Sequence, residues 1–120
     1  MKPTLLAAGA MSLAMSLAMS LAMALAVPAH ADPDTDFARE LQSYGIYGPR
    51  DYNAWLGKIV CERLHNGLDT DAAKSVKFIS PNLPRGSSPA QSWQFLGASI
   101  NTYCPDQRPV FEQAAAQQHG

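Results

Sequence analysis

The chain has 120 residues, and its nine basic and ten acidic side chains leave a formal net charge of −1. So balanced a composition lacks the basic surface of a nucleic-acid-binding protein and the single-sign field that steers charged substrates. Hydrophobic residues make up 47% of the chain, but all five methionines lie at or before Met23, in one apolar N-terminal stretch. The residues after that stretch suffice for one small domain.

The first 31 residues are predicted to be a secretory signal peptide. Lys2 supplies a positive charge, no charged residue occurs between Leu5 and Val27, and the segment ends in Ala29-His30-Ala31. A basic start, an apolar middle and an A-x-A exit are typical of a signal peptide, cleaved here after Ala31. The alternative is a retained membrane anchor, because about 20 apolar residues can cross a bilayer. The repeat MSLAMSLAMSLAMALA makes the apolar run long, but the A-x-A exit favours cleavage.

Two cysteines follow the predicted cleavage site. Export brings Cys61 and Cys104 into an oxidising compartment, where an even number of cysteines predicts a disulfide. The chain-entropy model values the closed loop at about 4 kcal/mol. A metal site is not indicated, because it needs a second cysteine pair or paired histidines.

Residues 32–36, DPDTD, are expected to form a solvated acidic leader, with Asp34 as the N-cap of the first helix. The spacing of the acids is that of a calcium loop. However, Phe37 stands where that loop needs glycine, and Ser43 stands where it needs glutamate. The sequence therefore predicts no calcium site here.

The first helix is predicted over residues 35–44. Its apolar residues Phe37, Leu41 and Tyr44 share one face, and Gly45 is placed to end it in a left-handed turn.

The second helix is predicted over residues 50–66. Its polar residues form one narrow strip: Asp51, Lys58, Glu62 and His65. Most of the remaining circumference is apolar, with Tyr52, Trp55, Leu56, Ile59, Val60 and Leu64. Such a helix is expected in the middle of a bundle, with Trp55 in the core. Arg63 points into the apolar arc and is expected to extend its head group to solvent.

A short third helix is predicted over residues 70–79, capped by Asp69 or Thr70, with Asp71 as a further cap. The segment 80–89 has three prolines and a glycine, which predicts a loop.

The fourth helix is predicted over residues 89–103, with Ser88 as its N-cap and Gln91 as the capping-box partner. Trp93, Leu96, Ile100 and Tyr103 form its inner stripe, and Pro105 ends it.

Phe95 points away from that stripe. Either the C-terminal segment covers it through Val110 and Phe111, or it lies on an exposed patch. Phe95 and Phe111 are therefore candidate contacts with a protein or lipid partner. Residues 109–118 are expected to be a marginal helix or a tail.

Catalytic chemistry has little support in the sequence. His65 is expected on the solvent-facing strip of its helix, and His119 lies at the end of the chain. No phosphate loop, H-E-x-x-H or G-x-S-x-G motif occurs, so no catalytic, metal or cofactor residue is assigned. We expect a protein that is not an enzyme.

Three blocks of residues together resemble a known family: Phe37, Leu41 and Gly45-Ile46; then Gly57 to Cys61 with Leu64 and Gly67; then Tyr103-Cys104-Pro105. This pattern is similar to the DUF732 family of small exported proteins from mycobacteria and other actinobacteria, over about residues 36–105. The resemblance implies export, an all-helical fold and a paired cysteine. It implies no activity, so no site residue is carried over. The proline-rich stretch 80–89 departs from the family pattern.

The sequence thus predicts an all-α protein, a four- to five-helix bundle stapled by one disulfide after a signal peptide. Residues 37–105 are the DUF732-like domain, and residues 106–120 are a C-terminal helix or tail. The expected function is a secreted or envelope module that binds a protein or lipid and touches the membrane only through its N-terminal segment. The alternatives are a membrane-tethered envelope protein and an enzyme with an unrecognised site.

Overall fold

The structure, a computed structural model, describes residues 32–119. Its elements are α2 (Pro33–Ser43), α3 (Arg50–His65), α4 (Ala72–Ile79), η1 (Ser80–Asn82), α5 (Pro89–Tyr103), η2 (Pro105–Gln107) and α6 (Arg108–His119), where η marks a short 3-10 helix. No strand occurs within these residues, so the predicted all-α fold class is confirmed. The predicted signal peptide, residues 1–31, lies outside the described residues.

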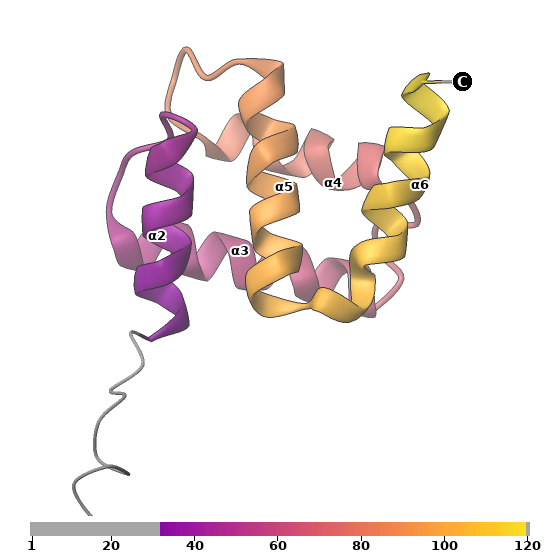
Figure 1. Ribbon diagram of the computed structural model, residues 1–120, viewed down its shortest axis with the longest axis horizontal. Helices are drawn as coiled ribbons and strands as arrows, with labels where there is room; N and C mark the ends of the chain where they lie inside the picture. The colour runs from indigo at the N-terminus through magenta and orange to yellow at the C-terminus, as the bar shows by residue number, and fades with distance from the viewer. Residues whose placement is uncertain (1–31, 120) are drawn as a thin grey trace, which may run out of the picture. The chain divides into compact units, whose positions relative to one another are not determined.

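The central element is α5. In Figure 1, α5 lies between α2 on one side and α6 on the other, and α3 and α4 cross behind them. Each of the other four α-helices packs against α5. Because α5 is enclosed on most sides, most of its circumference must be compatible with burial.

Local sequence signals fix where the helices begin. Ser88 caps α5 by accepting a hydrogen bond from the Gln91 amide at 3.1 Å, and the Gln91 side chain bonds back to the Ser88 amide at 2.8 Å. This capping box was predicted and is confirmed.

The starts of α2 and α4 correct two predictions. The cap of α2 is Asp32, not Asp34, so residues 33–36 belong to the helix and do not form a leader. Pro33 occupies the first helical position, where a missing N–H costs nothing. The cap of α4 is Asp71, whose Oδ1 accepts from the Lys74 amide at 2.9 Å, so neither Asp69 nor Thr70 has that role.

Glycine ends α2 as predicted. Gly45 adopts a φ of +79°, and the Ile46 amide donates to the Leu41 carbonyl at 2.9 Å. These features are those of a Schellman motif, which satisfies the last carbonyls of the helix.

The core lies between α5 and its neighbours. Its largest fully buried side chains are Phe37, Leu41, Leu56, Ile79, Phe95, Leu96 and Ile100. The predicted disulfide is present: Cys61 of α3 and Cys104, directly after α5, have Cα atoms 5.8 Å apart. It ties two helices that already pack side by side.

Gly57 allows α2 and the end of α5 to approach α3 closely. A Cβ at this position would lie 2.9 Å from Cζ of Phe37 and 3.1 Å from Cε2 of Tyr103. The groups that approach Gly57 are thus two aromatic rings.

The prediction that Trp55 lies in the core is wrong. Its side chain is 56% exposed, and that of Tyr52 is 40% exposed. The apolar arc of α3 is wider than the surface that its neighbours cover, because α5 and not α3 occupies the middle of the bundle.

The alternative that Phe95 is exposed is also wrong. Phe95 has no exposed surface, and its ring packs edge-on against Phe37 of α2, with centroids 5.4 Å apart. The C-terminal segment does form a helix, α6. Its Phe111 contacts a different side of α5, where it packs against Trp93 and would lie 3.3 Å from a Cβ added to Gly97. The other alternative, that the C-terminal segment covers Phe95 through Val110 and Phe111, is therefore wrong as well.

Candidate functional site

Three exposed aromatic side chains make the first candidate site. We call Tyr47, Tyr52 and Trp55 the aromatic patch; their exposed fractions are 64%, 40% and 56%. None of the three was predicted from the sequence to be a partner contact.

Local structure holds the patch in place. Tyr47 lies in the connection between α2 and α3, next to Gly48, which has a φ of +137°. Tyr52 and Trp55 are three residues apart on α3 and therefore share a face, with ring centroids 5.8 Å apart. The Tyr52 hydroxyl donates to the carbonyl of Asn82 at 3.0 Å, which orients its ring.

The proline-rich loop 80–88 borders both tyrosines. Asn82 accepts the hydrogen bond of Tyr52, and Tyr47 lines a shallow hollow together with Pro84 and Arg85. The side chain of Gln91 donates to the Tyr44 carbonyl at 3.1 Å, which links the start of α5 to the connection that carries Tyr47. The loop thus borders Tyr47 and Tyr52, and Tyr52 in turn packs against Trp55.

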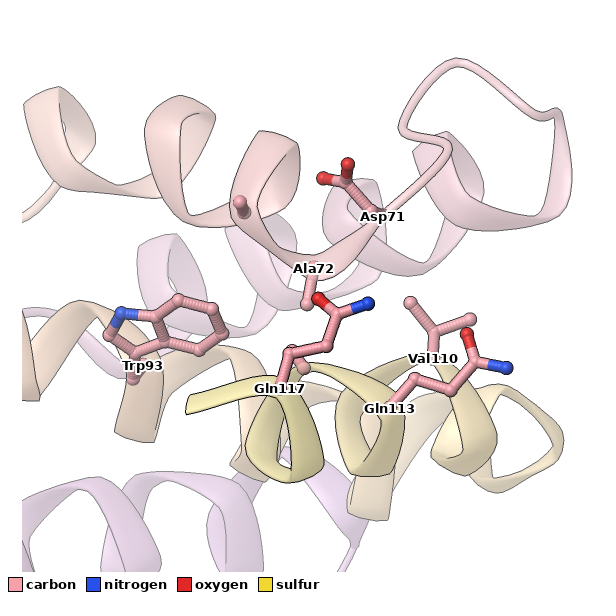
Figure 2. Close-up of a pocket in the computed structure, with 8 residues that line it drawn as sticks. Asp71, Ala72, Trp93, Val110, Gln113 and Gln117 are labelled. Atoms are coloured by element: carbon pink, nitrogen blue, oxygen red, sulfur yellow. The ribbon is translucent and has the colours of Figure 1, made fainter. Parts of the chain in front are cut away.

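The second candidate site is a cleft of about 230 Å³ among α4, α5 and α6. Figure 2 shows it from the side, with Trp93 at one end and Gln117 extending from α6 toward α4. We call it the α4–α6 cleft; its lining residues are Asp71, Ala72, Ala73, Trp93, Val110, Gln113, Ala114 and Gln117.

Arg63 forms a structural ion pair. Its Nε and Nη2 both lie 3.0 Å from the Asp69 carboxylate, which is buried and also accepts from Ser75 at 3.0 Å. The guanidinium stacks 4.1 Å from the ring centroid of Phe78. Two predictions are therefore wrong: the Arg63 head group does not extend freely into solvent, and Asp69 does not cap α4. The two residues instead bind each other and hold the α3–α4 connection in place.

His65 is on the surface, as expected, and it has a partner from later in the chain. Its Nε2 lies 2.8 Å from Oδ2 of Asp106 in η2. The hydrogen bond to His65 lowers the pKa of the Asp106 carboxyl below its ordinary value. This contact is a surface interaction that links the end of α3 to η2.

The partner contacts predicted from sequence are not brought together. Phe95 is buried, and Phe111 is half-buried against Trp93. One signal would have pointed to Trp55 instead. Asp51 lies four residues before Trp55, and Glu62 lies seven residues after it. Both spacings place these residues on the same side of the helix as Trp55, so Trp55 belongs to the polar strip.

The described part of the chain has neither a metal-ligand cluster nor a membrane-spanning helix. Within residues 32–119, no group of three or more His, Cys, Asp or Glu side chains is arranged to hold a metal ion. Within the same residues, no helix has both the length and the apolar character needed to cross a membrane.

The family model described as "Protein of unknown function (DUF732)" matches residues 33–106, which include both cysteines, the aromatic patch and the start of the segment after α5. The chain belongs to the DUF732 family. This membership confirms the resemblance inferred from Phe37, Cys61 and Tyr103-Cys104-Pro105.

Two curated relatives are similar to this DUF732 protein. They are the uncharacterized proteins MT0585 and Rv0559c of Mycobacterium tuberculosis, from two strains. Each is 53% identical to the chain over 88 residues, which is 72% of this chain and 79% of the relative. No solved structure matches the chain significantly.

Proposed function

We propose that this chain is an exported, non-enzymatic binding module of the cell envelope or secretome, and that it binds its partner through the aromatic patch and loop 80–88. The observation that carries the proposal is the exposure of Trp55. Tryptophan has the largest side chain, and here that side chain is more than half exposed on a helix whose opposite face is in the core. Burial of such a side chain is a strong driving force for association.

The chemistry of the surface supports this role. Trp, Tyr and Arg are the residues most enriched at the energetic centres of interfaces, and Tyr52, Trp55 and Arg85 lie on or beside this surface. Tyr and Trp supply a large contact area while few rotatable bonds are fixed, and Ser, Gly and Asn add adaptable hydrogen bonds. Loop 80–88 has all three of these polar types.

Export is supported by the sequence and by the disulfide. The segment 1–31 has the three parts of a signal peptide, and a disulfide between Cys61 and Cys104 suits an oxidising compartment. Cleavage after Ala31 would leave Asp32 as the first residue, so the cap of α2 would be kept.

Intact mass of the protein in the culture medium and in the envelope fraction of its host tests export. We expect one species that begins at Asp32. A chain that keeps residues 1–31 in the envelope fraction would support the membrane-tethered alternative and contradict cleavage. Full-length protein in the cytosol alone would contradict export.

Co-sedimentation with isolated host envelopes tests the patch. The wild-type protein, Trp55→Ala and Leu68→Ala are compared, because Leu68 is 62% exposed and lies outside the patch. We expect Trp55→Ala to reduce binding at least tenfold, as at an interface hot spot, and Leu68→Ala to bind as the wild type does. Equal binding of all three proteins would contradict the proposed surface.

A further inference from the structure

We infer that the α4–α6 cleft is a second binding site, for one ring of a neutral sugar. It shares no residue with the aromatic patch, so this inference goes beyond the proposed function. Its volume is about 230 Å³. Pockets for larger, drug-sized ligands measure roughly 300–1,000 Å³, so this cleft suits a ligand of about one ring.

The inner wall of the cleft is apolar. Trp93 closes one end, Val110 stands near the other, and the small side chains of Ala72 and Ala114 keep the space between them open (Figure 2). Trp93 is held in place because its ring packs edge-on against Phe111, with centroids 6.4 Å apart. A sugar ring has one face made of C–H groups, which can contact the apolar wall formed by the indole and by the side chains of Ala72, Val110 and Ala114.

The rim of the cleft is polar. Gln113 and Gln117 are one turn apart on α6, so both carboxamides face the cleft from the same side. Each carboxamide both donates and accepts hydrogen bonds, which matches a hydroxyl group in either orientation. Asp71 borders the cleft from the start of α4 and adds an acceptor.

The charge of Asp71 does not make the cleft a cation site. Its Oδ1 accepts a hydrogen bond from the Lys74 amide at 2.9 Å, so the carboxylate caps α4. The positive end of the helix dipole offsets part of its negative charge. No second acid lines the cleft, and a ligand with several hydroxyl groups uses the two carboxamides better than a cation does.

Nuclear magnetic resonance of the 15N-labelled protein, in the form that its host produces, tests the inference. The probes are glucose, galactose, mannose, arabinose and N-acetylglucosamine, with choline as a cationic probe. The readouts are the indole N–H signal of Trp93 and the side-chain amide signals of Gln113 and Gln117. We expect at least one sugar to shift these signals saturably.

Three variants make the test specific. Gln117→Ala removes one hydrogen-bonding group and should weaken binding of that sugar about three- to tenfold. Asp71→Asn keeps a competent helix cap but replaces the free carboxylate oxygen by an uncharged NH2 group, so it should weaken binding of a neutral sugar no more than Gln117→Ala does. A larger loss would show that the site recognises a positive charge and would contradict a neutral ligand. Gln42→Ala, an exposed glutamine on α2, is the matched control and should bind as wild type.

Two further results would overturn the inference. One is the absence of saturable shifts with every sugar of the panel up to its solubility limit. The other is that choline shifts the cleft signals while the sugars do not, since that would identify a site for a cation.

Discussion

An aromatic residue in the first two turns of α3 and one in the middle of α5 differ in burial, in the opposite sense to that suggested by their places on the two helices. Trp55 lies on a helix that is apolar over most of its circumference, yet it is 56% exposed. Phe95 lies opposite the apolar stripe of its own helix, yet it is completely buried. The number of apolar side chains is therefore a poor guide to which helix is central. The charged residues are a better guide, because α5 has none whereas α3 has five.

Small and polar residues explain the reversal. Ser92, Ala98 and Ser99 extend the buried surface of α5 around to Phe95. Both serine hydroxyl groups are buried but have hydrogen-bond partners. The Ser99 hydroxyl donates to the Phe95 carbonyl at 2.7 Å, and the Ser92 hydroxyl lies 2.9 Å from that of Ser80. These small side chains let the neighbouring helices approach α5 closely on several sides.

Substitution of the two aromatics gives the sharpest test of this comparison. Phe95→Ala should lower the free energy of unfolding by about 3–5 kcal/mol, because it leaves a cavity against Phe37. Trp55→Ala should lower it by about 1 kcal/mol or less, because the indole is mostly in water and loses mainly its contact with Tyr52. Urea denaturation followed by circular dichroism measures both. Similar losses in the two variants would contradict the assigned burial.

Removal of the disulfide tests how much the bond between α3 and the end of α5 contributes to stability. The double variant Cys61→Ala/Cys104→Ala reopens a loop with a sequence separation of 43 residues. We expect a loss of about 4 kcal/mol in the free energy of unfolding, mainly through the unfolded chain. The measurement is again urea denaturation, with the reduced wild-type protein as a control. A loss below about 1 kcal/mol would show that the unfolded chain is already compact without the bond.

Gly57 of α3 and Gly97 of α5 allow the same substitution to be compared on the two helices. Gly57→Ala should be destabilising by about 1 kcal/mol or more despite the better helix propensity of alanine, because the new Cβ would meet the buried ring of Phe37 at 2.9 Å. Gly97→Ala should be neutral or slightly stabilising, because Phe111, at 3.3 Å, is half-buried on α6 and can move. Thermal melting compares the two. The opposite order of melting temperatures would contradict the difference in packing between these sites.

The smallest expected effect is a pH dependence at Asp34. The Tyr103 hydroxyl donates to Asp34 at 2.7 Å, and this bond lowers the pKa of the carboxyl below its ordinary 3.8 although burial opposes the change. Because the folded-state pKa is the lower one, the stabilisation is present above the unfolded pKa and is lost as pH falls through the folded pKa.

Tyr103→Phe isolates that contribution. The variant should raise the pKa of Asp34, measured by carboxyl chemical shift, and should lose less stability than wild type between neutral pH and acid. An unchanged Asp34 pKa in the variant would show that Lys58, which lies 3.4 Å away, is the dominant cause.

Most of the local structure was predictable from short segments. The capping box at Ser88, the glycine end at Gly45 and the cysteine pair follow from residues whose chemistry acts on their immediate neighbours. The start of α2 carried the same kind of signal, an aspartate before Pro33, and the acidic residues around it hid that signal. The pair of Arg63 and Asp69 was only partly indicated. Arg63 pointed into the apolar arc of its helix, but nothing in the sequence identified Asp69 as its partner.

The sequence by itself determined that the chain is helical, where most helices begin and end, and that one disulfide joins the second half of α3 to the end of α5. These features depend on backbone hydrogen bonds and on contacts within a few residues, or on the only two cysteines present. Only the tertiary structure decided that α5 is central, that Phe95 is buried, that Trp55 is exposed, and that a cleft lies among α4, α5 and α6. Burial depends on how closely neighbouring helices approach. That distance is set by small residues such as Gly57 and Ser99, which a count of apolar side chains does not weigh.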